Sequence, residues 1–160
     1  MHCIHELSLQ AFTVAMAHVH ASREEENVAF DPNKLTQTQK EELIARVESR
    51  TELQEGCMVW QGMARKHGYP QMKLGAHIAK VTGSPNKAYN PARILYSVHH
   101  NEILFKYSNN RLSHLCHNKL CCSIEHLTLE PLAINIQRNT CMREGTCVGH
   151  GNQPNCKIHA

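Results

Sequence analysis

The stretch "SHLCHNKLCCSIEHL", residues 113–127, places three cysteines and three histidines within fifteen positions. Thiolates and imidazoles are the preferred protein ligands of zinc, and the spacing Cys116-x4-Cys121-x4-His126 gives one short loop three of them. A tetrahedral site needs a fourth ligand from outside the loop. We expect it to be Cys57, 59 residues upstream of Cys116, because this bridge would tie an earlier strand to the loop.

A second set of soft ligands lies closer to the end of the sequence. It occupies sixteen residues, which are rich in glycine and poor in apolar side chains, and consists of Cys141, Cys147, His150 and Cys156. Because such a segment has little apolar surface to bury, we expect it to fold only around a metal ion. His159 is an alternative to Cys156 as the last ligand, and Cys3 and Cys122 are left over as buried or free thiols. Ordinary cysteines without metal are the alternative for both sets.

Length and composition favour metal over disulfides as the means of stabilisation. The 160 residues suit one domain of ordinary size, yet only 5 % of them are aromatic, beside 8 cysteines and 13 histidines. Polar residues interrupt the apolar positions of residues 1–23, which is unlike a signal for export. We therefore expect an intracellular, reducing environment in which thiolates are free to hold zinc. No stretch approaches the ~20 apolar residues that span a membrane, so no membrane partner is expected.

The net charge of +3 is unevenly distributed along the chain. Residues 1–56 carry 5 basic and 10 acidic residues, whereas residues 57–160 carry 12 basic and 4 acidic residues. The basic part is typical of a protein that binds a polyanion, although the basic face of an ordinary soluble domain is the alternative. We divide the chain accordingly into an acidic helical segment, residues 1–56, and a zinc-stabilised domain, residues 57–160.

The pattern of apolar residues predicts short helices and strands. One helix is predicted over residues 6–19 and a second from Thr38, where Thr38 and Glu41 suit a capping box. Both are expected to act as packing elements or as a partner surface. Later in the chain the pattern predicts two strands around a turn in 57–74, a helix in 91–98, strands in 103–107 and 111–115, and a helix in 131–139.

A longer stretch of the sequence resembles a known family. "SHLCHNKLCCSIEHLTLEPLAINIQRNTC", residues 113–141, is similar to the signature of the His-Cys box homing endonucleases, a branch of the ββα-metal or His-Me finger nucleases related to HNH enzymes. The resemblance extends more loosely over residues 57–156 through "GCMVWQG" and "ARILYSVHHNEI". It implies an α+β fold: a ββα-metal nuclease core with two structural zinc sites, little regular core and a helical N-terminal extension.

The resemblance also implies roles for single residues. His114 occupies the place of the general base, and Cys116, Cys121 and His126 match zinc ligands. Asn135, on the helix that follows, occupies the place of the residue that holds a catalytic magnesium ion. His117 is expected to buttress the zinc loop rather than to take part in the reaction.

Physical reasoning supports a hydrolytic role for two of these positions. Hydrolysis of a phosphodiester needs a base for the attacking water and a cation that neutralises charge on the phosphate. The imidazole of His114 suits the first task, and the neutral carbonyl of Asn135 suits magnesium or another divalent cation. Arg138, one helical turn from Asn135, is expected to grip a neighbouring phosphate. The alternatives are a zinc-ligating or ordinary strand histidine at 114, a solvated Asn135 and a surface charge at Arg138.

Contacts with DNA are expected from the strands that follow Cys57. In the resembling family such strands enter the major groove, and the polar side chains suited to contact bases or phosphates are here Gln61, Arg65, Lys66, Gln71 and Lys73. Some of them are expected to be ordinary solvent-facing residues. The family also has an arginine near the scissile phosphate, whose place here falls near Gln71, with Arg65 or Lys73 as substitutes.

The sequence as a whole predicts a magnesium-dependent DNA endonuclease similar to the enzymes of intron homing. Its expected cofactors are two structural zinc ions and one catalytic magnesium ion, and its expected partner is double-stranded DNA. One alternative is a zinc-stabilised DNA-binding module without cleavage, and another is an interaction protein that works through its N-terminal helices. A homodimer is expected to use the N-terminal segment rather than a C-terminal tail, and nuclear residence is inferred from the DNA substrate.

Overall fold

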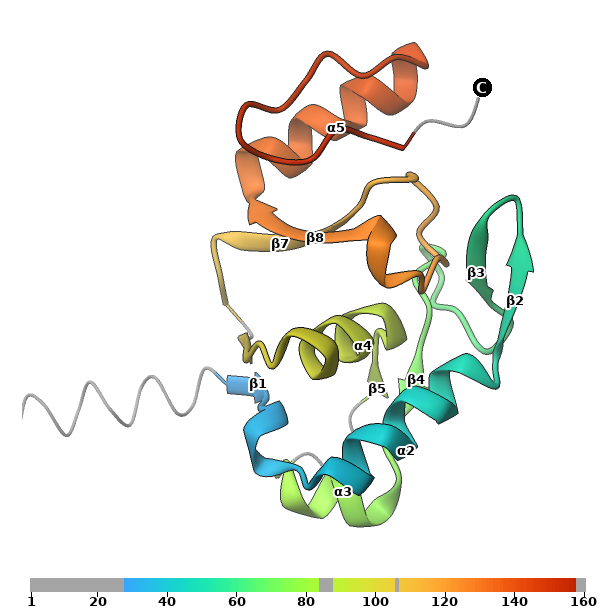
Figure 1. The fold of residues 1–160 in the computed structure, drawn as a ribbon, viewed down its shortest axis with the longest axis vertical. Coiled ribbons are helices and arrows are strands. Elements are labelled where there is room, and N and C mark those ends of the chain that lie inside the picture. Colours follow the sequence, from blue (N-terminus) through green and yellow to red (C-terminus); the bar gives the residue numbers. More distant parts are fainter. Residues whose placement is uncertain (1–27, 84–87, 106, 158–160) are drawn as a thin grey trace, which may run out of the picture.

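The computed structural model describes residues 28–83, 88–105 and 107–157 of the chain. Within these ranges short helices alternate with short strands (Figure 1). The helices are η1 (Pro32–Lys34), α2 (Gln37–Glu48), α3 (Ala76–Val81), α4 (Pro91–His100), η2 (Ile124–His126) and α5 (Leu132–Glu144), of which η1 and η2 are 3-10 turns. The helix predicted over residues 6–19 lies outside the described residues.

The strands pair two by two in separate antiparallel sheets. The pairs are β1 (Val28–Phe30) with β6 (Leu104–Phe105), β2 (Thr51–Gln54) with β3 (Cys57–Trp60), β4 (Met72–Lys73) with β5 (Ala88–Tyr89), and β7 (Asn110–His114) with β8 (Leu127–Pro131). The mixed α+β class predicted from the sequence is confirmed. Because a two-stranded sheet is only marginally stable alone, helices and side-chain clusters have to hold each pair in place.

The larger of the two buried clusters among the described residues combines apolar side chains of α2, α3 and α4 with side chains from strands and loops, such as Trp60 and Leu127. α2 packs against α4, and its Leu43 and Val47 are buried in this contact. β2 and β3 are hydrogen-bonded to each other although they lie on either side of residue 56. The described residues before Cys57 therefore share a core and a sheet with those after it, and no break in packing follows the division proposed from charge.

Capping residues decide where α2 begins. The Thr36 hydroxyl accepts a hydrogen bond from the Gln39 backbone N–H, and the Gln39 side chain accepts one from the Thr36 N–H. The predicted capping box of Thr38 and Glu41 is thus wrong by two residues. Both pairs have the spacing that a capping box requires, and the earlier pair is the one used because the helix begins at Gln37.

α4 agrees closely with its prediction. Asn90 accepts hydrogen bonds from the first backbone N–H groups of the helix, and Pro91 occupies the first turn, where its missing N–H costs nothing. Ile94, Leu95 and Val98 are buried, as their helical spacing predicts. The helix continues two residues beyond the predicted end, and both of these residues, His99 and His100, are exposed.

The strands predicted in residues 57–74 pair differently from the prediction. β3 pairs with β2, whereas residues 63–65 and 69–71 form a narrow hairpin of their own. In this hairpin the Arg65 N–H donates to the Tyr69 carbonyl and the Gly68 N–H donates to the Arg65 carbonyl. Gly68 has a φ of 79°, which suits glycine and confirms the predicted turn.

Trp60 holds the junction between β3 and this hairpin. It is the chain's single tryptophan, is only 3 % exposed, and donates from its indole N–H to the Met63 carbonyl at 3.1 Å. Gly62 lies directly against the ring, since a Cβ there would come within 2.5 Å of it. A side chain at residue 62 would therefore push the indole out of its place.

β7, β8 and α5 form a continuous ββα unit. His114 pairs with Leu127 at one end of the hairpin, and the loop between the two strands carries the cysteines of residues 113–127. β8 was not predicted from the sequence, and the helix was predicted to end at residue 139, whereas α5 runs to Glu144 and stops at Gly145, whose φ is 67°. The unit places the end of β7 beside the first turns of α5.

Candidate active site and metal centres

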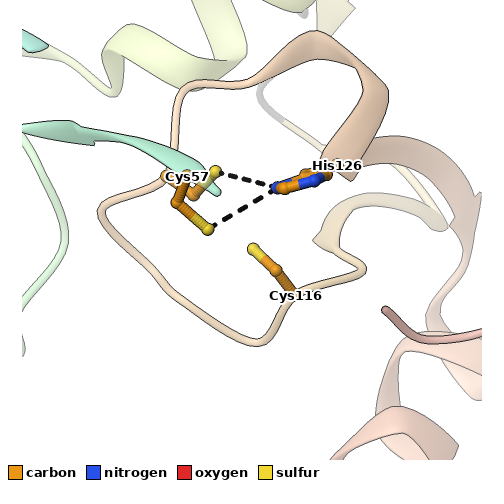
Figure 2. Close-up of side chains that lie close together, drawn as sticks. Cys57, Cys116 and His126 are labelled. Atoms are coloured by element: carbon orange, nitrogen blue, oxygen red, sulfur yellow. Dashed lines mark hydrogen bonds between the residues drawn. The ribbon is translucent and has the colours of Figure 1, made fainter. Parts of the chain in front are cut away.

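Four side chains from three segments meet at the first metal centre (Figure 2). Cys57 comes from β3, Cys116 and Cys121 come from the β7–β8 loop, and His126 ends η2. Their ligand atoms all lie within 4.8 Å of one another. The structure thus brings together the four residues that spacing predicted, and it fastens the β2–β3 hairpin to the loop.

The geometry and chemistry of this centre fit zinc. The His126 Nδ1 lies 3.6 Å from the Cys57 Sγ and 3.4 Å from the Cys121 Sγ. Tetrahedral zinc, with sulfur at ~2.3 Å and nitrogen at ~2.0 Å, separates such atoms by about 3.5 Å. A hydrogen bond from Cys116 lowers the pKa of the Cys121 thiol to about 4, the same contact raises the pKa of the Cys116 thiol, and burial raises the pKa of the Cys57 thiol. Cys121 is therefore the first of the three thiols to become the thiolate that zinc binds. Three sulfurs and one nitrogen suit zinc far better than a hard cation.

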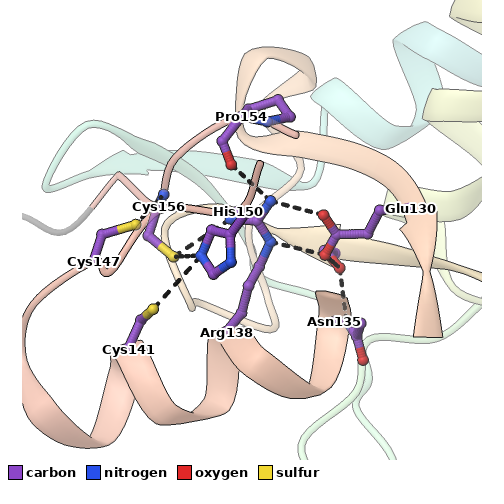
Figure 3. Close-up of polar contacts among 9 residues, drawn as sticks. Glu130, Asn135, Arg138, Cys141, Cys147, His150, Pro154 and Cys156 are labelled. Carbon is purple, nitrogen blue, oxygen red and sulfur yellow. Dashed lines mark hydrogen bonds and ion pairs between the residues drawn. The ribbon is translucent and has the colours of Figure 1, made fainter. Parts of the chain in front are cut away.

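The second metal centre is built between α5 and the loop that follows it (Figure 3). The ligand atoms of Cys141, Cys147, His150 and Cys156 lie within 4.8 Å of one another. The His150 Nε2 is 3.5 Å from the Cys141 Sγ and 3.4 Å from the Cys156 Sγ, so the same fit to zinc holds. Cys156 therefore completes the set, and the alternative ligand His159 lies outside the described residues.

His114 lies at the end of β7, next to the first centre but not part of it. Its Nε2 is 3.1 Å from the Cys121 carbonyl oxygen. Because a carbonyl can only accept, Nε2 carries the proton and Nδ1 keeps its lone pair. Burial lowers the pKa of His114, so the ring is neutral at neutral pH. Among the described residues neither centre includes His114, so the alternative of a zinc ligand is not supported.

Asn135 lies in the first turn of α5 and is held by the neighbouring hairpin. Its Nδ2 donates to the Ser113 hydroxyl oxygen at 2.7 Å. The amide oxygen points to the opposite side, away from that contact (Figure 3). Asn135 is therefore not a solvated helix residue, because its amide has a fixed direction.

A pocket of about 590 Å³ opens between the narrow hairpin, the start of α4 and the ββα unit. His114 and Asn135 both line it, together with Arg65, Arg93 and Arg111. None of the described residues that line it is acidic. Burial, and after it the positive charge of Arg111, lowers the pKa of Arg93. Such a pocket suits an anion.

Arg93 and Arg111 were not predicted from the sequence as site residues. Arg93 lies in the first turn of α4, and Arg111 lies three residues before His114 in β7. The one feature of the sequence that could have indicated either arginine is the short separation of Arg111 from His114, the proposed base. Arg93 reaches the pocket because the core packs α4 beside the ββα unit, which no local pattern reveals.

Comparison with known proteins places the chain in a family. Residues 44–158 match the family described as the zinc-binding loop region of homing endonuclease. The chain belongs to this family. The matched range contains both metal centres, His114 and Asn135, so the predicted resemblance is confirmed. No curated protein and no solved structure gives a significant match, and within the described ranges no helix has the length and apolar character to cross a membrane.

Arg138 of this homing endonuclease family member does not reach the pocket, which corrects its predicted role as a phosphate grip. The side chain is 3 % exposed. Its guanidinium forms a bidentate pair with Glu130, with Nε to Oε1 at 2.8 Å and the second nitrogen to Oε2 at 2.7 Å. Its terminal nitrogens also donate to the Cys156 Sγ and to the Pro154 carbonyl, in the loop of the second centre. Helical spacing puts Arg138 near Asn135, but the buried carboxylate turns its side chain inward.

Two further residues of the signature stretch, His117 and Cys122, belong to neither metal centre. His117 lies three residues after His114 in a tight turn with a φ of 60°, and its backbone N–H donates to the His114 carbonyl at 3.0 Å. Its role as a buttress of the zinc loop stays a prediction. Cys122 is buried and belongs to neither centre, and burial raises the pKa of its thiol to about 12. Cys3, the other cysteine left over, lies outside the described residues.

The residues predicted to contact DNA divide into two groups. Arg65 and Gln71 face each other across the narrow hairpin and line the pocket. When the Gln71 amide oxygen is turned toward Arg65, it accepts a hydrogen bond from a terminal guanidinium nitrogen of Arg65 at 3.0 Å. Gln61, Lys66 and Lys73 are exposed and lie outside the pocket. Contact of these five residues with DNA stays a prediction.

Proposed function

We propose that this homing endonuclease family member is a magnesium-dependent DNA endonuclease. The observation that carries the proposal is that His114 and Asn135 line one pocket with three arginines. A base, a carbonyl oxygen for a hard cation and several positive charges for phosphate are the groups that phosphodiester hydrolysis needs. The pocket volume of about 590 Å³ exceeds that of a phosphate group.

His114 is the proposed general base. With Nε2 committed to the Cys121 carbonyl, the attacking water gives its proton to Nδ1. The lowered pKa of His114 keeps the ring unprotonated and ready at neutral pH. The Cys121 carbonyl belongs to the first metal centre, so zinc at that centre fixes the direction of the base without entering the reaction.

Asn135 is the proposed cation ligand. Its amide oxygen is the hard, neutral donor that magnesium accepts, and magnesium in nuclease sites keeps waters and substrate phosphates as its other ligands. When bound, the cation supplies neutralisation of charge on the phosphate and on the departing 3′ oxygen. The neutral amide leaves the full charge of the ion for that purpose, and the pocket's arginines add to it.

The test is cleavage of supercoiled plasmid with and without magnesium. We expect the wild-type chain to convert plasmid to nicked or linear DNA in magnesium and to stop when the cation is chelated. His114→Ala should lower the cleavage rate by about 10²–10⁴-fold, the usual contribution of a general base. Asn135→Ala should lower it by a similar factor while DNA binding and zinc content stay unchanged.

The matched control is His77→Ala, which removes an exposed histidine of α3 that pairs with Glu42 far from the pocket. It should cleave like the wild type. Cleavage by His114→Ala at the wild-type rate would remove that residue from the mechanism. Salt-sensitive DNA binding without any nicking by the wild type would favour the binding-module alternative instead. Nuclear residence, site-specific homing and a homodimer stay predictions.

A further inference from the structure

A chain of buried polar contacts leads away from the back of Asn135 (Figure 3). The Asn135 Nδ2 donates to the Ser113 hydroxyl at 2.7 Å. The Ser113 hydroxyl in turn makes a short hydrogen bond to the Glu130 Oε1. The same carboxylate oxygen accepts from the Arg138 Nε at 2.8 Å. These contacts join β7, β8 and α5 behind the pocket.

The far end of this chain reaches the second metal centre. One terminal nitrogen of Arg138 donates to the Cys156 Sγ at 3.4 Å, and the other donates to the Pro154 carbonyl at 2.8 Å. Cys156 is a ligand of that centre. A continuous path of hydrogen bonds therefore connects a zinc ligand to the amide of Asn135.

The donors and acceptors along the path fix which way the Asn135 amide faces. The Glu130 carboxylate, paired with a guanidinium, can only accept, so the single hydroxyl proton of Ser113 goes to it. The hydroxyl oxygen is then left as an acceptor, which only the amide nitrogen of Asn135 can satisfy. Its oxygen must point the other way, which is the orientation that a cation ligand needs.

The side chains along this path are deeply buried, which indicates that the path has a role besides stabilising the fold. Ser113, Glu130 and Arg138 are 1 %, 0 % and 3 % exposed. Removing an ion pair from water is costly, and well-packed apolar residues of similar volume often stabilise a protein as well or better. A fully satisfied buried network instead specifies one arrangement of its neighbours.

We propose that Ser113, Glu130 and Arg138 are positioning residues that hold the Asn135 amide oxygen toward the pocket and couple its direction to the second zinc centre. The coupling to catalysis rests on the proposed function, in which Asn135 binds the cation. The orientation itself does not, because it follows from the hydrogen bonds alone. The second zinc centre thereby gains a role at the cation site besides closing its own loop.

The first experiment reads the amide directly. The side-chain N–H signals of Asn135 are assigned by comparison with Asn135→Ala and followed by NMR in the zinc-loaded protein without DNA. Ser113→Ala should shift these signals and speed their exchange with solvent. The matched control is Ser97→Ala in α4, which removes an equally buried hydroxyl that donates to the Glu102 carbonyl and should leave the Asn135 signals unchanged.

The second experiment measures cation binding without turnover. Mn²⁺ is titrated into complexes of plasmid-derived DNA with protein that also carries His114→Ala, and bound Mn²⁺ is counted by electron paramagnetic resonance. Ser113→Ala should weaken Mn²⁺ binding by about tenfold or more, the usual effect of losing a hydrogen bond behind a metal ligand. Zinc content should stay at two ions per chain.

The outcomes separate this inference from the proposed function. Wild-type Mn²⁺ affinity together with unchanged Asn135 signals in Ser113→Ala would overturn the positioning role. A wild-type protein that binds no Mn²⁺, while its Asn135 signals still respond to Ser113→Ala, would support the orienting contacts and remove the proposed function. Should Ser113→Ala fail to fold, Glu130→Gln keeps the volume of the side chain and must show the same two changes, or the inference is wrong.

Discussion

The two metal centres use the same kinds of ligand, three cysteines and one histidine, but they join very different parts of the chain. The first links Cys57 to His126, 69 residues apart, and so fastens β3 to the loop of the ββα unit. The second closes within residues 141–156 at the end of α5. One centre organises the fold, whereas the other organises a single helix end.

The difference extends to the two pocket residues proposed for catalysis, His114 and Asn135. The first centre supports the proposed base, since the Cys121 carbonyl holds His114. The second supports the proposed cation ligand through Arg138 and the contacts behind Asn135. The first centre also closes a loop that is longer than that of the second by roughly two doublings. Closing the longer loop lowers the conformational entropy of the unfolded chain more, which corresponds to about 1 kcal/mol of additional stabilisation. Loss of the first centre should therefore be the more damaging of the two.

The largest expected effect is the loss of cooperative folding in Cys57→Ala, compared with Cys147→Ala. Cys57→Ala breaks the link between β3 and the loop, so we expect loss of one zinc ion, loss of a cooperative thermal transition and no detectable cleavage. Cys147→Ala should also lose one zinc ion but keep a cooperative transition for the remaining fold. Zinc content by mass spectrometry and melting by circular dichroism check both. Equal melting behaviour of the two variants would break the comparison.

Chelation should distinguish the centres by rate. Two ligands of the second centre, Cys147 and Cys156, are half-buried, against only Cys116 in the first. We expect a chelator such as EDTA to remove zinc in two phases, the faster from the second centre, with the α2–α4 core intact after it. A zinc-release assay followed alongside circular dichroism measures the phases. Cys122→Ala, which alters a buried non-ligand thiol, should release zinc with the same two phases.

The pH dependence of cleavage should sharpen the link between the first centre and His114. Burial lowers the pKa of His114 below its ordinary 6.5, so the unprotonated base persists at more acidic pH. The rate should therefore fall only when the pH drops below 6.5, through this lowered pKa, rather than around it. The profile of cleavage rate against pH checks this, with zinc content measured at each point. An acid limb centred above 6.5 with both zinc ions bound would contradict it.

The smallest expected effect concerns the pocket arginines, which belong to neither centre. Arg93→Ala should weaken DNA binding and reduce the slope of log K against log salt by about 0.9, the value for one phosphate contact. Binding is measured by fluorescence anisotropy at several salt concentrations. Arg143→Ala is the control, because Arg143 is exposed at the end of α5 beside Glu144. An equal change of slope in both variants would reduce Arg93 to a general surface charge.

Ligand spacing made the metal centres predictable from sequence. Cysteine and histidine have few other reasons to recur at such short intervals, and Cys57 was the remaining upstream candidate near a strand. His114 and Asn135 were proposed as site residues because they lie in the stretch that resembles the family signature. The turn at Gly68 and the inward face of α4 followed from glycine and from helical periodicity.

Arg138 could not be placed by the same means. Its spacing from Asn135 is compatible with two directions of the side chain, and Glu130 decides between them from β8, a strand that the apolar pattern did not reveal. The start of α2 was misplaced because two capping pairs fit the same rule. Pocket residues such as Arg93 depend on long-range packing, which single-sequence patterns do not carry.

The buried indole of Trp60 gives the molecule a built-in optical reporter. The ring is the chain's sole tryptophan fluorophore and lies in β3, three residues after a thiolate of the first centre. The backbone N–H of Trp60 also donates to the carbonyl of Leu120, the residue before Cys121 of that centre. Emission from this one ring should therefore redden when zinc leaves the first centre and stay constant when zinc leaves only the second, so occupancy can be followed without a label.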